Sequence, residues 1–84
     1  MEIEFTSKAQ EQYQYWIDKD RKTLKKINEL IKDIQRTPFT GKGKPEMLKF
    51  NFTGCWSRRI NHEHRLVYMV ENGTIIILQC RYHY

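Results

Sequence analysis

The apolar pattern of this chain changes its period once, at Pro38, and that change constrains the possible fold more than any other feature. Before Pro38, apolar residues recur every three or four positions, as they do on one face of a helix. After it, they form short runs separated by turn residues, which is typical of strands. Helices followed by a run of antiparallel strands predict an α+β domain. We expect a single domain over residues 1–84, because a chain of this length holds one core.

The first part of the chain predicts a short strand and a helical hairpin. Residues 3–5 alternate in polarity, and Ser7 with Gln10 fits a capping box at the start of a helix. Asp20 is the expected N-cap of a second helix, which Pro38 ends. The short connection predicts that the two helices run antiparallel. Their apolar stripes, expected to pack on a sheet, are Ala9, Tyr13, Trp16 and Ile17 in the first helix and Leu24, Ile27, Leu30, Ile31 and Ile34 in the second.

The second part predicts a loop over residues 38–45 and then strands at 46–50, 55–60, 64–71 and 74–82. In the last hairpin, a three-residue loop at Glu71–Gly73 sorts apolar from polar side chains better than a two-residue turn at Asn72–Gly73. The three-residue loop would place Ile76 and Leu78 on the face of Leu66, Tyr68, Val70, Cys80 and Tyr82. It would also bring Arg65 and His83 onto one face at the same end of the hairpin.

Charge is unevenly distributed along the chain. Residues 1–36 hold eight Lys and Arg against seven Asp and Glu, whereas residues 37–84 hold seven against three. The second part could therefore meet a polyanion such as nucleic acid. No apolar run approaches the roughly 20 residues that cross a bilayer, and the first residues do not resemble a secretion signal. We expect a cytoplasmic protein without a membrane partner.

Two small sets of residues in the sequence could form metal or redox sites. Cys55 and Cys80 lie in apolar, strand-like runs, so both are expected to be reduced and buried. His62 and His64 would share one face of a strand, but no third ligand has a suitable spacing. We expect no metal and no other cofactor.

Metal-free cleavage of RNA needs a base for the 2′-hydroxyl, an acid for the leaving 5′-oxygen and cations for the charge that grows on phosphorus. Glu46 is a candidate base and His83 a candidate acid. Candidate cations for phosphate are Lys44, Lys49, Arg58, Arg59, Arg65 and Arg81. The same residue types also occur on ordinary solvated surfaces, so their spacing leaves both interpretations open.

Several segments closely resemble the YoeB toxins of the RelE/ParE superfamily of bacterial toxin–antitoxin systems. These segments are Lys42–Glu46, Trp56–Ile60, Glu63–Tyr68 and Cys80–Tyr84, with residues 26–33 and 36–39 extending the likeness. The resemblance implies a microbial-ribonuclease-like fold, with two helices on a curved antiparallel sheet of about four to five strands. It also implies mRNA cleavage in the decoding site of the ribosome, inhibition of translation, a YefM-like antitoxin and a homodimer.

By position in that family, Glu46 matches the general base, Arg65 the phosphate-stabilising group and His83 the general acid. Tyr84 matches a required aromatic residue, and Arg59 and Lys49 match supporting basic positions. We therefore expect a two-residue C-terminal truncation to silence the protein without unfolding it. Two alternatives stay open: a ParE-like poison of DNA gyrase, and a basic RNA-binding module without catalysis.

Overall fold

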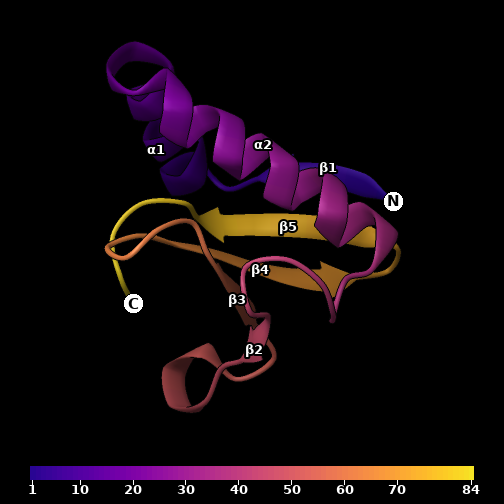
Figure 1. Cartoon of the computed structure of the whole chain (residues 1–84). Helices are drawn as coiled ribbons and strands as arrows, with labels where there is room; N and C mark the ends of the chain where they lie inside the picture. The colour runs from indigo at the N-terminus through magenta and orange to yellow at the C-terminus, as the bar shows by residue number, and fades with distance from the viewer.

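The computed structural model describes all 84 residues and has two layers, a helical hairpin on one face of a five-stranded sheet (Figure 1). The elements are β1 (Glu2–Phe5), α1 (Ser7–Lys19), α2 (Arg21–Arg36), β2 (Glu46–Met47), a 3₁₀ helix (Phe50–Phe52), β3 (Trp56–Arg59), β4 (Arg65–Glu71) and β5 (Thr74–Gln79). The strand order is β1-β5-β4-β3-β2. The α+β prediction is confirmed. No helix is long and apolar enough to cross a membrane.

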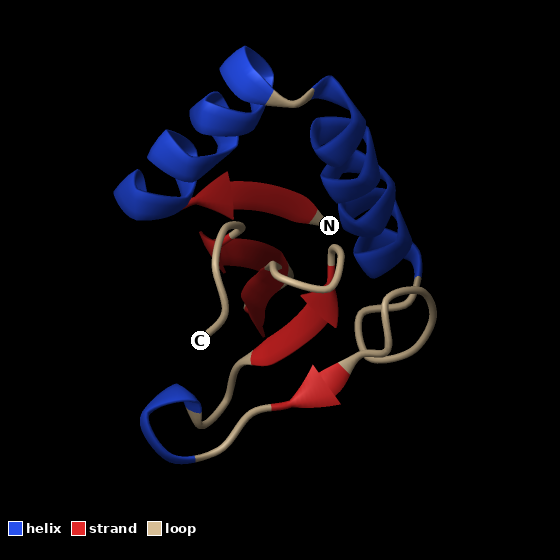
Figure 2. Cartoon of the chain, turned by 60° about the vertical axis from the view of Figure 1, so that its left-hand side comes forward, coloured by secondary structure: helices blue, strands red, loops and turns tan.

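The sheet is mixed, so the expectation of an antiparallel sheet is wrong for one strand. β2, β3, β4 and β5 pair antiparallel, but β1 pairs parallel with β5. β5 already uses one edge to bind β4, and β1 occupies the remaining edge. The helices connect β1 to the rest of the sheet, and Figure 2 shows them together on the same side of it.

The helix starts follow from side-chain caps. Thr6, and not Ser7, is the N-cap of α1, because its hydroxyl accepts a hydrogen bond from the Ala9 amide at 3.1 Å. The predicted capping box is therefore one residue too late. Asp20 caps α2 as expected, accepting from the amide and hydroxyl of Thr23 at 3.1 and 2.7 Å. These bonds lower the pKa of Asp20, the hydroxyl of Thr23 contributing most.

The β4–β5 hairpin uses the two-residue turn, so the preferred three-residue register is wrong near the turn. Asn72 and Gly73 both have positive φ, at 50° and 76°, and Glu71 pairs with Thr74. Further along, the register shifts: Tyr68 pairs with Ile77 but Val67 pairs with Gln79. Leu78 is the extra residue of this bulge. Because of the two-residue turn, Ile75 and Ile77, and not Ile76 and Leu78, face the helices, and the bulge brings Cys80 to the same side.

The main core lies between the helices and the sheet. It includes Ala9, Trp16, Ile27, Leu30 and Ile34 from the helices, and Ile60, Leu66, Tyr68, Ile75, Ile77 and Cys80 from the sheet and its borders. A smaller cluster of Leu48, Cys55 and Val67 covers the opposite face. Both cysteines are buried and free, as predicted. The helical stripes thus pack on the sheet, as their period indicates.

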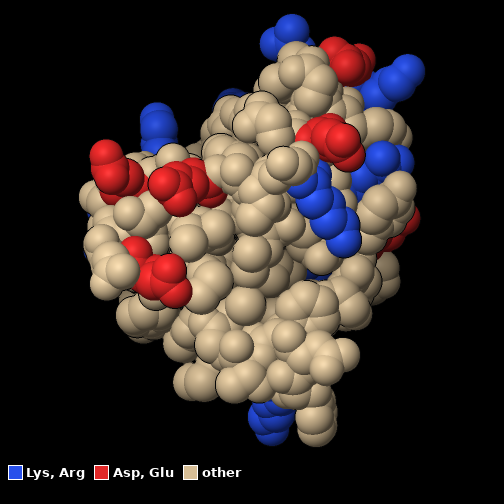
Figure 3. Space-filling view, turned by 180° about the vertical axis from the view of Figure 1, so that it is seen from behind, with Lys and Arg blue, Asp and Glu red and all other residues tan.

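The charged side chains leave part of the surface free. Figure 3 shows the molecule from behind, with several Asp and Glu side chains along the left side, a mixture of acidic and basic side chains at the upper right, and a broad central to lower area without Lys, Arg, Asp or Glu. That central area offers no cation to a polyanion. A nucleic acid would have to find its cations elsewhere on the protein.

Candidate active site

Alternation along β3 separates two neighbouring arginines. Ser57 and Arg59 face away from the helices, whereas Arg58 between them faces α2. Glu46 of β2 pairs with Ser57, and Arg59 pairs with Arg65 of β4. Because paired residues point to the same side of a sheet, Glu46, Ser57, Arg59 and Arg65 share the helix-free face.

These side chains line a cavity of about 370 Å³, which we call the basic cavity. Its walls are Lys44, Pro45, Glu46, Ser57, Arg59, Arg65, His83 and Tyr84. Three cationic side chains thus surround one carboxylate and one imidazole. The structure brings together Lys44, Glu46, Arg59, Arg65, His83 and Tyr84, six of the residues expected from the sequence.

Hydrogen bonds join the carboxylate to the C-terminal tyrosine. The Tyr84 hydroxyl donates to Glu46 Oε1 at 3.0 Å, and the Ser57 hydroxyl lies 3.4 Å from the Tyr84 oxygen, to which it donates. Ser57 is buried and was not expected from the sequence. Its place opposite Glu46 could have been found only from the β2–β3 register.

The orientation of Arg65 is set by the loop before β4. Its Nη1 donates to the carbonyls of Asn61 and His64 at 2.9 and 3.1 Å. The guanidinium has five N–H donors, so those not bonded to the loop stay available for a ligand in the basic cavity. Nothing in the sequence marks Asn61 as a residue that orients Arg65.

His83 reaches the basic cavity by a route that differs from the predicted one. β5 ends at Gln79 and not near residue 82, so strand alternation does not carry His83 there. Instead the chain turns at Tyr82, which has a left-handed φ of 68°. The predicted proximity of Arg65 and His83 is confirmed, because both line the cavity. The reason given for it, a shared strand face, was wrong.

Arg58 does not face the cavity, and its predicted role in phosphate binding is wrong. Its side chain is 0% exposed, and its Nη1 lies 2.5 Å from Asp33 of α2. The remaining bonds from its guanidinium go to Tyr68 Oη and to the carbonyls of Thr37, Thr40 and Lys42. All five donors are therefore used within the protein.

This network holds the loop that carries Lys44 and leads to Glu46 at the start of β2. Asp33 also accepts a hydrogen bond from the Lys42 amide at 2.9 Å. That amide first, and the Arg58 guanidinium second, hold the pKa of Asp33 below its ordinary value. Arg59 completes the connection, since its amide donates to the Gly43 carbonyl at 2.7 Å. Arg58 thus supports the cavity from behind the sheet.

Arg81 and Lys49 also lie outside the basic cavity. The Arg81 guanidinium stacks 3.4 Å above the ring of Tyr15 in α1 and 4.5 Å from that of Tyr82, so the expectation that it contacts phosphate there is not met. Lys49 lines a neighbouring hollow. Its role in RNA binding stays a prediction.

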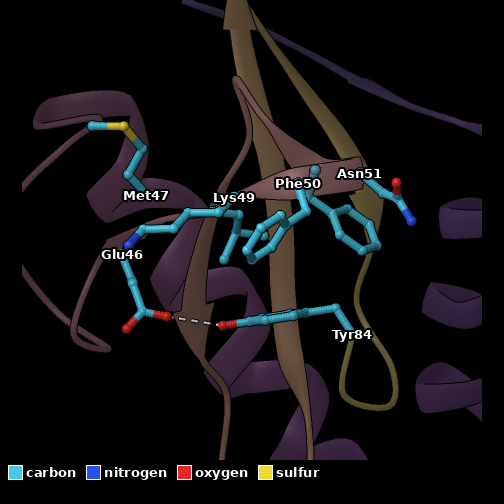
Figure 4. A pocket seen from close by; sticks show the side chains of 8 residues that line it. Glu46, Met47, Lys49, Phe50, Asn51 and Tyr84 are labelled. Atoms are coloured by element: carbon cyan, nitrogen blue, oxygen red, sulfur yellow. Dashed lines mark hydrogen bonds between the residues drawn. The ribbon is translucent and has the colours of Figure 1, made fainter.

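This apolar hollow lies directly beside the basic cavity. It has a volume of about 520 Å³, and its lining is the segment Glu46–Phe52 together with Tyr84. Figure 4 shows the Tyr84 hydroxyl pointing to Glu46, with Met47, Lys49 and Phe50 placed around the same space. Glu46 and Tyr84 are thus the wall shared by the hollow and the basic cavity.

Phe50 is held in an exposed position at the hollow. Its side chain is 90% exposed, and its φ of 58° is unusual for an aromatic residue. Thr53 stabilises this conformation, because its amide and its hydroxyl both donate to the Phe50 carbonyl, at 3.1 and 2.7 Å. This conformation keeps the Phe50 ring at the surface, where it lines the hollow.

The distribution of possible metal ligands gives no cluster. Nowhere do three His, Cys, Asp or Glu side chains come together. His62 is exposed, whereas the ring of His64 packs edge-to-face on Trp16, with 4.9 Å between ring centroids. The two histidines therefore differ in environment.

Comparison with known proteins assigns the family. Residues 5–84 match the model of the YoeB-like toxin of the bacterial type II toxin–antitoxin system. The chain belongs to this YoeB-like toxin family. The YoeB toxin of Escherichia coli K12 is 55% identical over 84 residues, which cover 100% of both chains. The protein is thus the toxin of a type II toxin–antitoxin system.

Solved structures of YoeB relatives have the same fold. A YoeB/ParE toxin from Agrobacterium tumefaciens superposes with a TM-score of 0.98 at 44% identity, covering 100% of each chain. YoeB from Staphylococcus aureus, in a heterotetrameric complex with YefM, superposes with a TM-score of 0.92 at 54% identity, covering 100% of this chain and 98% of that one. The same S. aureus protein is also known as a dimer.

Proposed function

We propose that this YoeB-like toxin is a ribosome-dependent endoribonuclease that cuts mRNA in the decoding site and so inhibits translation. The observation that carries the proposal is the composition of the basic cavity: Glu46 and His83 share it with Lys44, Arg59 and Arg65. A carboxylate and an imidazole can act as base and acid, and cations can stabilise a phosphorane.

In the proposed reaction, Glu46 accepts the proton of the 2′-hydroxyl, and the resulting oxygen attacks the adjacent phosphorus. The bond from phosphorus to the 5′-oxygen breaks, and His83 donates a proton to that oxygen. The products are a 2′,3′-cyclic phosphate, which can hydrolyse to a 3′-phosphate, and a 5′-hydroxyl end. All steps of this proposed reaction are proton transfers or displacements at phosphorus, so the reaction requires no metal.

Two neighbours of these groups have supporting roles. Arg65 would bind the non-bridging oxygens of the phosphate through its free donors, with Arg59 and Lys44 adding positive charge. Tyr84 donates to Glu46 at 3.0 Å and therefore orients that carboxylate before the RNA enters. The 2′-hydroxyl would replace Tyr84 as the partner of Glu46 when the substrate binds.

The apolar hollow suits the base next to the scissile phosphate. Phe50, Phe52 and Tyr84 are aromatic side chains on or in its lining, and aromatic rings stack on unpaired bases in single-stranded RNA. Lys49 adds a cation for the backbone of the same nucleotide. The shared wall of Glu46 and Tyr84 would keep this base adjacent to the reacting 2′-hydroxyl.

We further propose a YefM-like antitoxin as the cytoplasmic inhibitor of this protein, and a homodimer as its free form. The complex and the dimer of the S. aureus YoeB relative support these assignments. Acidic side chains of an antitoxin would complement the three cations of the basic cavity. Co-expression and co-purification would test the complex, and light scattering of the purified protein would test the dimer.

The decisive experiment maps the 5′ ends of mRNA with and without ribosomes. The wild-type protein should produce new 5′-hydroxyl ends only on ribosomes. Glu46→Gln and His83→Gln should each reduce cleavage about 10²–10⁴-fold without a change in melting temperature. Glu71→Gln is the matched control. Glu71 is the last residue of β4, beside the β4–β5 turn, so this variant should cleave mRNA as the wild type does.

Three outcomes would reject the proposal. Unchanged cleavage in the Glu46 and His83 variants would remove their catalytic roles. Binding to ribosomes without new 5′ ends would indicate an RNA-binding module. Covalent gyrase–DNA complexes in a gyrase assay, without mRNA cleavage, would indicate a ParE-like poison.

A further inference from the structure

The segment Cys80–Tyr84 carries two proposed active-site residues, although it belongs to no strand. Its first residue is held by α1. The Cys80 amide donates to Gln12 Oε1 at 2.8 Å, and Trp16 Nε1 donates to the Cys80 carbonyl at 2.8 Å. Both contacts are buried, so Cys80 is a fixed point from which the segment leaves the sheet.

Both the amide and the carbonyl of Tyr82 form hydrogen bonds, and their partners are the consecutive residues His64 and Arg65. The Tyr82 amide donates to His64 Nδ1 at 2.7 Å, and the Tyr82 carbonyl accepts from the Arg65 amide at 3.0 Å. Tyr82 has a φ of 68°, in the left-handed region that is unfavourable for a residue with a Cβ atom. Without its partners this turn would not be favoured, and His83 and Tyr84 follow it directly.

The ring of His64 is itself oriented by packing. It lies edge-to-face against Trp16, with centroids 4.9 Å apart and planes at 78°. Trp16 is only 5% exposed and is tied to Cys80. To accept from the Tyr82 amide, Nδ1 must carry a lone pair, which places the ring proton on Nε2.

We propose that His64 is a positioning residue for the active site, which accepts the Tyr82 N–H and so holds the left-handed turn that delivers His83 and Tyr84 to the basic cavity. His64 and Arg65 are adjacent, so one short segment orients the acid, the tyrosine and the phosphate-binding guanidinium together. This inference rests on the proposed function for its catalytic consequence, but not for the geometry of Tyr82.

Two substitutions separate the hydrogen bond from the packing of the ring. His64→Phe keeps an aromatic ring on Trp16 but has no acceptor. His64→Asn offers an oxygen near the position of Nδ1 but has no ring. We expect His64→Phe to lower kcat about tenfold, equivalent to about 1.4 kcal/mol, with KM for programmed ribosomes unchanged. His64→Asn should retain most of the wild-type kcat. His62→Phe is the matched control, because the His62 side chain is exposed and should be replaceable without effect.

Hydrogen exchange of the Tyr82 amide gives a readout that needs no RNA. It should be faster than in the wild type in His64→Phe and close to the wild-type rate in His64→Asn. In the wild-type protein itself, an NMR scalar coupling between the Tyr82 amide nitrogen and His64 Nδ1 should be observed, even if a variant fails to fold.

The results that overturn the proposal are distinct from those that overturn the function. Wild-type kcat and wild-type Tyr82 exchange in His64→Phe would show that the bond does not position the segment. A loss of kcat in His64→Asn, with wild-type kcat in His64→Phe, would show that ring packing alone matters. If the wild type cuts no RNA, the proposed function fails, while the exchange rates and the coupling still decide whether His64 holds Tyr82.

Discussion

Replacement of Arg58 by methionine and replacement of Arg59 by methionine should change different properties of the protein, although the two residues are neighbours in β3. Arg58 is fully buried, and all five of its N–H donors are used by Asp33, Tyr68 and three loop carbonyls. Arg59 is exposed and lines the basic cavity. We therefore expect Arg58→Met to change stability and Arg59→Met to change RNA binding.

The size of the stability change follows from this burial. Removing one partner of a buried, hydrogen-bonded ion pair costs about 3–5 kcal/mol. A domain of this length has a total stability of about 4–13 kcal/mol. Each lost kcal/mol lowers the melting temperature of such a domain by about 4–8 °C, so Arg58→Met should melt at least about 12 °C below the wild type. For Arg59→Met the change in free energy should stay within about 0.5 kcal/mol.

The assay combines thermal and guanidinium unfolding, followed by circular dichroism, with RNA affinity as a function of salt. Arg59→Met should reduce the salt dependence of binding by about one counterion, as expected for a lost phosphate contact. Arg58→Met, measured below its melting temperature, should keep the wild-type salt dependence. A melting temperature of Arg58→Met within about 3 °C of the wild type, together with a reduced salt slope, would refute the assignment of Arg58 to the loop network.

Three further predictions concern Asp33, Phe50 and the cysteines. The Lys42 amide and Arg58 lower the pKa of Asp33, so its stabilising effect is full above the ordinary value of 3.8 and is lost as pH falls through the lower folded value; acid unfolding monitored by circular dichroism should be flatter in Asp33→Asn, and an identical profile would contradict this. Phe50→Ala should weaken RNA binding by about 1–3 kcal/mol without a change in melting temperature; an unchanged KM for programmed ribosomes would show that no base enters the hollow. Burial raises the pKa of the Cys80 thiol to about 12, so mass spectrometry after alkylation of the native protein should find Cys80 unmodified, with Cys55 reacting first.

The local patterns of the chain were sufficient for the class of fold and for the helical layer. The helical layer was predicted from the helical spacing of apolar residues, the Asp20 cap and the stop at Pro38. Each of these signals depends on residues within a few positions of one another, so it can be recognised without tertiary structure. Six of the eight residues that line the basic cavity were predicted from their chemistry or from the resemblance to YoeB toxins. Pro45 and Ser57 were not among the predicted site residues.

Only tertiary structure decided the details that depend on pairing between distant segments. The two-residue turn places Ile75 and Ile77 on the helix side of the sheet, and the bulge at Leu78 then brings Cys80 to the same side. No local signal marks this combination, because both registers offer apolar residues to each face. The parallel edge of β1 depends on which edge of β5 remains free. Arg58 and Arg59 are identical side chains in consecutive positions, yet strand alternation buries one against Asp33 and leaves the other in the cavity. Composition and spacing cannot distinguish them, because the difference is made by what α2 places on one side of the sheet.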